Sequence, residues 1–101
     1  SAHISFGSDW PVSDNDWRPG VATAVTRQTA AGVPAAGWTP AERITLSDAL
    51  DSYSVGVAHQ AFADAGRDLV WLDRDPRAAA PHDLREVRVL GTWIAGVRRT
   101  A

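Results

Sequence analysis

The 101-residue chain contains no cysteine, which excludes disulfide bonds and thiolate metal sites. Lysine is also absent, because all ten residues of the Lys+Arg count are arginine. No Schiff-base lysine, and no carbamylated lysine bridging two metal ions, can therefore come from this chain. No apolar run approaches the roughly 18 residues of a membrane-spanning helix, and no basic region followed by an apolar stretch indicates a signal peptide. We expect a cytoplasmic protein with no membrane partner.

An excess of charge of one sign is also lacking, since the formal net charge is −2. Nothing in this balance favours binding to nucleic acid or to an anionic membrane surface. Hydrophobic residues make up 45% of the chain and charged residues 22%, which is typical of a soluble globular protein. The length suits one domain with a modest core.

The first half of the sequence predicts a strand, a loop and a helix. Residues 2–6 (AHISF) indicate a short buried strand with Ile4 and Phe6 on one face. Residues 7–16 are rich in Gly, Pro, Ser, Asp and Asn and predict a loop. Pro19 suits the first turn of a helix, and Val21, Ala24, Val25 and Gln28 follow at helical spacing.

The middle of the sequence carries signals for the start of a longer helix. Residues 39–42 (TPAE) form a capping box with proline at the first helical position, and a second cap-like run follows at residues 45–48. Apolar residues then recur at helical spacing, which predicts one amphipathic helix from about Leu46 to Ala63. The connection before it, residues 29–37, is expected to be exposed.

Beyond Gly66 the pattern favours strands. Residues 69–72 (LVWL) predict a buried strand, residues 74–83 a loop and residues 87–92 a second strand. Residues 94–97 predict a tight turn into a last strand, and Trp71 and Trp93 are expected in the core. The resulting order, one strand, two helices and then two or three strands, is unusual for a self-contained domain.

Four stretches together resemble a known family: FGSDWPVSD, TPAERITLSDAL, LVWLD and EVRVLGTWIAG. They are similar to the C-terminal part of the amidohydrolase superfamily, and most similar to family 3, the branch of N-substituted formamide deformylases. The resemblance implies an α/β fold: the C-terminal fragment of a (β/α)₈ hydrolase barrel plus strands of a small β-sandwich. Residues 1–66 would supply the last barrel strand and closing helices, and residues 67–101 the sandwich strands.

The same resemblance implies a metal-dependent enzyme that hydrolyses a C–N bond in a small amide-like substrate through metal-activated water. Asp9 matches the carboxylate at the end of the eighth barrel strand, and would ligate the metal and act as the catalytic proton acceptor. Trp10 and Ser8 become candidate substrate contacts. The expected metal is one or two Zn²⁺ ions. Their other ligands, a His-x-His pair among them, lie outside this sequence, so the chain alone is expected to be inactive.

Several alternatives stay open at this point. Asp14 and Asp16 could form a two-carboxylate metal site, although loop solvation and helix N-terminal charge suit them better. His3, His59 and His82 lack metal-ligand spacing with one another. The short link at residues 65–68 is consistent with a deletion or with an omitted loop. The chain could also be a truncated, non-catalytic binding or assembly module. In either case the rest of a barrel, or a second copy, is expected to cover an exposed apolar face.

Overall fold

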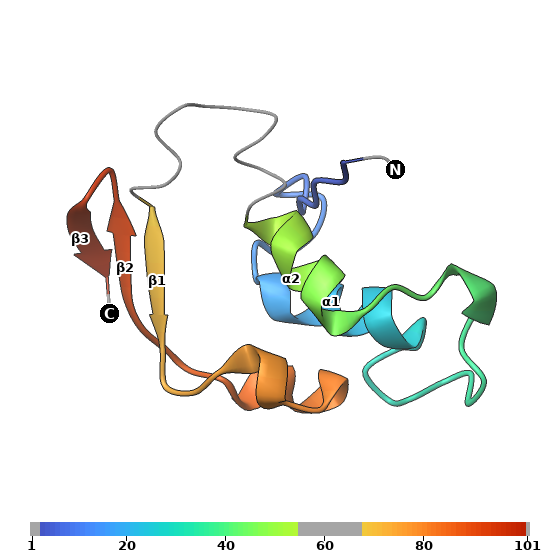
Figure 1. Ribbon diagram of the computed structural model, residues 1–101. Helices are drawn as coiled ribbons and strands as arrows, with labels where there is room; N and C mark the ends of the chain where they lie inside the picture. The colour runs from blue at the N-terminus through green and yellow to red at the C-terminus, as the bar shows by residue number, and fades with distance from the viewer. Residues whose placement is uncertain (1–2, 55–67, 101) are drawn as a thin grey trace.

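A computed structural model describes residues 3–54 and 68–100 of the chain. Two helices pack together on one side, and a three-stranded sheet stands apart from them on the other (Figure 1). The elements are α1 (Trp17–Thr26), η1 (Pro40–Glu42), α2 (Leu46–Tyr53), β1 (Leu69–Leu72), η3 (Pro76–Ala78), η4 (Pro81–Glu86), β2 (Val89–Ile94) and β3 (Val97–Thr100), where η denotes a short 3-10 helix.

Helix α1 confirms the first predicted helix. Asp16 caps its N-terminus, because the side chain accepts a hydrogen bond from the Arg18 N–H. Arg27 ends the helix in the left-handed conformation, with φ 58°, and its N–H bonds the Thr23 carbonyl. Gln28 therefore lies beyond the helix rather than on its apolar stripe.

The start of α2 was also predicted correctly, but the capping box before it was not. Thr45 caps α2, since its hydroxyl oxygen accepts from the Asp48 N–H at 3.0 Å. Thr39 instead has φ 44° and makes no side-chain cap; its hydroxyl accepts from the Arg27 guanidinium at 2.7 Å. Residues 40–42 form only a 3-10 turn, and the predicted helical residues 55–63 lie outside the described part of the chain.

The predicted strand at the N-terminus is wrong, because residues 3–8 have no regular secondary structure. A strand needs a neighbouring strand to bond its backbone, and no described strand lies beside this segment. The segment bonds to α2 instead. The Phe6 N–H donates to the Ser52 carbonyl at 2.9 Å, and the Phe6 and Tyr53 rings pack edge to face with 5.3 Å between their centroids.

The three strands form an antiparallel sheet in the order β1-β2-β3. The sequence predicted the three strands, the second of them two residues too early, but not the order in which they pair. Ala95 and Gly96 join β2 to β3 with φ 51° and 79°, which is the conformation of a two-residue type I′ turn. At the other end, Asp73 ties β1 to β2: its backbone N–H bonds the Arg88 carbonyl and its carboxylate accepts from the Arg74 and Arg88 side chains. The hydrogen bonds that the carboxylate accepts from the Arg74 side chain, and from the backbone N–H and side chain of Arg88, hold the pKa of Asp73 well below its usual range.

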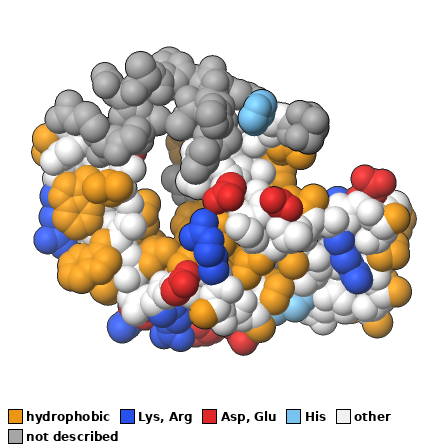
Figure 2. Space-filling model, in the orientation of Figure 1, with side chains coloured by type: hydrophobic (Ala, Val, Ile, Leu, Met, Phe, Trp, Pro, Cys, Tyr) orange, Lys and Arg blue, Asp and Glu red, His pale blue; other side chains and the backbone are white. Residues whose placement is uncertain are grey.

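The expected core positions of the two sheet tryptophans need correction. Trp71 is 57% exposed, and Leu69 and Val70 before it are exposed as well, whereas Leu72 at the end of β1 is partly buried against the core. Trp93 is half-buried; it lies under the Arg98 guanidinium, 5.4 Å from the ring centre. Figure 2 shows hydrophobic side chains gathered over the part of the molecule that holds the sheet.

The buried core joins the two helices to η4. Its fully or nearly fully buried members are Val21 of α1, Ala49 and Leu50 of α2, Leu84 of η4, and Val87. Arg18 reinforces this junction, since its guanidinium donates to the carbonyls of Val87 at 2.7 Å and Arg85 at 3.3 Å. Neither helix, as far as residues 3–54 and 68–100 show, has the length and apolar character needed to cross a bilayer.

Candidate functional site

A tight turn at residues 9–12 displays Asp9, the main candidate from the sequence. Asp9 has φ 50°, a left-handed conformation that non-glycine residues seldom adopt. The Val12 N–H donates to the Asp9 carbonyl at 2.8 Å, and the Ser13 hydroxyl donates to the Ser8 carbonyl at 2.5 Å. The side chain of Asp9 is exposed, and among residues 3–54 and 68–100 no side-chain hydrogen bond or ion pair occupies its carboxylate, so its oxygens can accept from a ligand.

The side chains beside this carboxylate are apolar and exposed. Trp10 is 70% exposed and Val12 is 81% exposed. Ser8, the other predicted contact, is half-buried, and its carbonyl accepts the hydrogen bond from the Ser13 hydroxyl. Asp9 and Trp10 thus lie on this turn with Ser8 directly before it, and the turn displays a carboxylate together with exposed apolar side chains.

Packing against α1 and α2 fixes the position of the segment before the turn. Phe6 contacts Tyr53 and bonds to Ser52, which is itself buried and donates its hydroxyl to the Asp48 carbonyl at 2.7 Å. Tyr53 in turn lies against Gly20 of α1, where an added methyl group would overlap the tyrosine hydroxyl. Burial raises the pKa of Tyr53. Contacts with the two packed helices therefore hold the segment that leads to Asp9.

The acidic pair that follows the turn is structural. The Asp16 N–H donates to Asp14 at 3.0 Å, and Asp16 accepts from the Arg18 side chain at 2.8 Å while capping α1. The hydrogen bonds from Arg18 lower the pKa of Asp16. This arrangement agrees with the helix N-terminal interpretation of the pair rather than with a two-carboxylate metal site.

The described residues supply only part of the ligand set that a metal ion needs. In the segments that the structure covers, no three His, Asp or Glu side chains come together as a cation needs. His59 lies outside those segments. The Asp9 carboxylate, exposed and free to accept, fits the role of one oxygen ligand in a site completed by other residues.

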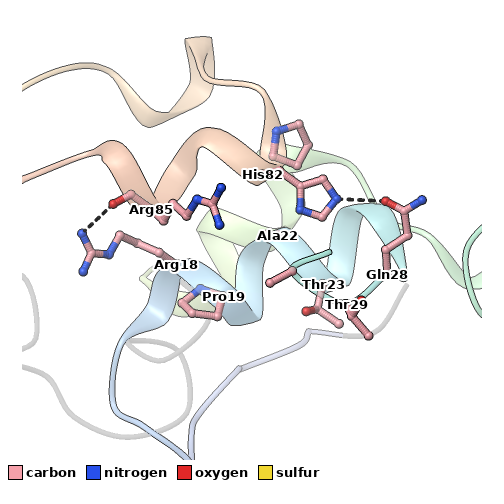
Figure 3. Close-up of a pocket in the computed structure, with 10 residues that line it drawn as sticks. Arg18, Pro19, Ala22, Thr23, Gln28, Thr29, His82 and Arg85 are labelled. Carbon is pink, nitrogen blue, oxygen red and sulfur yellow. Dashed lines mark hydrogen bonds between the residues drawn. The ribbon is translucent and has the colours of Figure 1, made fainter. Parts of the chain in front are cut away.

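The structure also contains a shallow hollow of about 90 Å³ between α1 and η4 (Figure 3). The His82 ring bonds the Gln28 amide oxygen at 2.9 Å across it. The Gln28 amide nitrogen donates to the carbonyls of Pro34 at 3.1 Å and Ala35 at 2.9 Å. Gln28 thereby fastens the 29–37 connection to η4. Sequence spacing could not reveal this contact, because its partners are 54 positions apart.

Comparison with known proteins agrees with the resemblance that the sequence motifs indicated. N-substituted formamide deformylase of Arthrobacter pascens is 36% identical over 105 aligned residues, which cover 95% of this chain and 19% of that protein. Protein LONG AFTER FAR-RED 3 of Arabidopsis thaliana is 39% identical over 67 residues, covering 63% of this chain and 11% of that protein. The chain therefore spans about a fifth or less of the length of these relatives.

No solved structure matches the chain significantly. The sequence profile of the amidohydrolase family, by contrast, matches residues 2–99. The match includes the Asp9 turn, both helices and nearly all of the sheet, and on this evidence the chain belongs to the amidohydrolase family.

Proposed function

We propose that this chain is the C-terminal part of a metal-dependent hydrolase that cleaves a C–N bond in a small amide. The observation that carries the proposal is the family match over residues 2–99. The relative from Arthrobacter pascens, whose name describes a formamide deformylase, supports the choice of bond. The exposed carboxylate of Asp9, held on a turn above two packed helices, is consistent with a catalytic group.

Asp9 would act as a metal ligand and as the proton acceptor of the reaction. A bound divalent metal, Zn²⁺ in this proposal, would lower the pKa of water to about 7 and so supply hydroxide near neutral pH. Asp9 would accept the proton that the attacking water loses and pass it to the departing amine nitrogen. Trp10 and Ser8 would contact the substrate. Whether one ion or two are held depends on ligands outside this sequence.

In the proposed assembly, residues 1–66 complete a (β/α)₈ barrel and residues 67–101 belong to a small β-sandwich. Barrel enzymes place their reactive groups at the carboxyl ends of the strands. A second sandwich layer would cover the exposed side chains of β1.

The proposal is tested by comparing the complete protein with the 101-residue chain in an assay of N-substituted amide hydrolysis. We expect the zinc-loaded complete protein to release amine, a chelator to abolish that release and added Zn²⁺ to restore it. The isolated chain should be inactive at equal concentration. A metal-loaded complete protein that hydrolyses no member of an amide panel would contradict the proposal.

A second candidate function is a non-catalytic binding or assembly module. Five large hydrophobic side chains of the sheet are about half exposed or more, namely Leu69, Val70, Trp71, Ile94 and Val97, and exposed apolar clusters favour association. The intact mass of the purified protein under denaturing conditions separates the two readings. A mass of 10.8 kDa, with concentration-dependent association, would favour the module, whereas a mass several times larger favours the hydrolase.

A further inference from the structure

We propose that Ser13 is a positioning residue that holds the Asp9 carboxylate in its working orientation. This inference rests on the proposed function, because it assigns Ser13 a role in the same reaction. The Ser13 hydroxyl donates to the Ser8 carbonyl at 2.5 Å. These two residues flank the 9–12 turn, so their hydrogen bond closes a ring of backbone around Asp9.

Asp9 needs such a restraint because its backbone conformation is unfavourable. A φ of 50° brings the Cβ atom close to the carbonyl oxygen, and L residues avoid this region. If the turn opened, Asp9 would relax towards negative φ. The direction in which its side chain leaves the backbone would then change.

The hydrogen bond of Ser13 joins two arms of the turn that are anchored on different helices. On the N-terminal arm, the Phe6 N–H bonds the Ser52 carbonyl of α2 at 2.9 Å. On the C-terminal arm, Asp14 accepts from the Asp16 N–H at 3.0 Å, and Asp16 caps α1. The Ser13 hydroxyl thus supplies a side-chain hydrogen bond that links the two arms across Asp9.

Ser13 lies outside the core, so an effect of its mutation on the orientation of Asp9 can be distinguished from a loss of global stability. Its side chain is exposed, whereas the core consists of residues from α1, α2 and η4 together with Val87. Exposed hydrogen bonds contribute little to global stability. Small displacements of a reacting group, by contrast, can lower turnover many-fold. Loss of the hydroxyl should therefore affect catalysis far more than folding.

The test uses the complete metal-loaded protein with Ser13→Ala, Ser13→Thr and the matched control Ser47→Ala, an exposed serine on α2. We expect Ser13→Ala to lower kcat about tenfold while KM changes less than about threefold. Ser13→Thr keeps the hydroxyl and should restore most of kcat. Ser47→Ala should match the parent protein. The Val12 amide, bonded to the Asp9 carbonyl, should exchange with solvent faster in Ser13→Ala alone.

Asp9→Asn, measured in parallel, separates this inference from the proposed function. If Asp9→Asn abolishes turnover while Ser13→Ala keeps the parent kcat and Val12 exchange rate, the role of Ser13 is wrong and that of Asp9 stands. If Ser13→Ala loses thermal stability in proportion to activity and Ser13→Thr does not restore kcat, the residue is merely structural and the inference fails. If Asp9→Asn remains active, both proposals fall.

Discussion

Replacing Leu84 by Ala tests whether the junction of α1, α2 and η4 is the core of this chain. Leu84 has 0% exposed surface and belongs to the same buried cluster as Val21 and Leu50. Truncating a fully buried leucine removes its transfer free energy and leaves a cavity, at a cost of about 2–5 kcal/mol. Because this cluster has only five buried members, we expect a loss within the middle of that range, about 3 kcal/mol.

Leu69→Ala provides the matched control, since the same atoms are removed from a side chain that is 59% exposed. Its cost should be about 0.5–1 kcal/mol, from the apolar area that is lost. Both values can be measured from urea-induced unfolding followed by far-ultraviolet circular dichroism. Equal losses for the two variants, or a loss below about 0.5 kcal/mol for Leu84→Ala, would refute this description of the core.

Three further predictions concern the loops and the first helix cap. Gly37→Ala should lower the free energy of unfolding by roughly 1–3 kcal/mol, because φ is +81° and the new methyl group would lie 2.7 Å from a backbone carbonyl. Gly7→Ala is the control and should have no effect, since the added methyl group meets nothing within 4 Å. Equal denaturation midpoints for the two variants would contradict this prediction. Asp16→Asn should destabilise the chain at neutral pH but not in acid. Arg18 depresses the folded-state pKa of Asp16 below its ordinary value of 3.8, so its contribution is present above that pH and lost as pH falls through the lower folded pKa; a pH-independent difference in unfolding free energy would argue against it. Gly96→Ala, at φ 79° in the β2–β3 turn, should cost about 1 kcal/mol, and unchanged amide protection in β3 would count against the assigned turn type.

The sequence predicted those elements that depend on local patterns. Pro19 and the apolar spacing after it located α1, and the cap at residues 45–48 gave the start of α2. Short apolar runs predicted the strands, and Ala95-Gly96 marked the hairpin turn. In each case the decisive interactions lie within a few residues, where spacing and propensity report them directly.

Predictions failed where long-range partners decide the structure. Thr39 carries a good capping sequence, but Arg27 takes its hydroxyl and the backbone is left-handed. Residues 2–6 have the composition of a strand, yet the structure describes no strand to pair with residues 3–6, and Phe6 bonds to α2 instead. Trp71 was expected in a core because it lies on a predicted sandwich strand, whereas its burial depends on a layer that the described residues do not supply.

The candidate site was only partly readable from the sequence. The motif around residues 6–14 drew attention to Asp9, Trp10 and Ser8, and the structure places Asp9 and Trp10 on an exposed turn that Ser8 precedes. The role of Ser13 within that turn became visible only through its bond to the Ser8 carbonyl. The contact between His82 and Gln28 likewise gave no local signal, because it depends on how η4 docks against the end of α1.

The measurement that tests the central claim most directly is the turnover of Asp9→Asn in the complete, metal-loaded protein. Asp14→Asn is the matched control, because asparagine keeps the side-chain oxygen that accepts the Asp16 N–H. If Asp9 ligates the metal and accepts the proton, Asp9→Asn should lower kcat at least about a hundredfold with an unchanged circular dichroism spectrum, and Asp14→Asn should keep nearly full activity. Activity of Asp9→Asn within a few-fold of the parent protein would contradict the account.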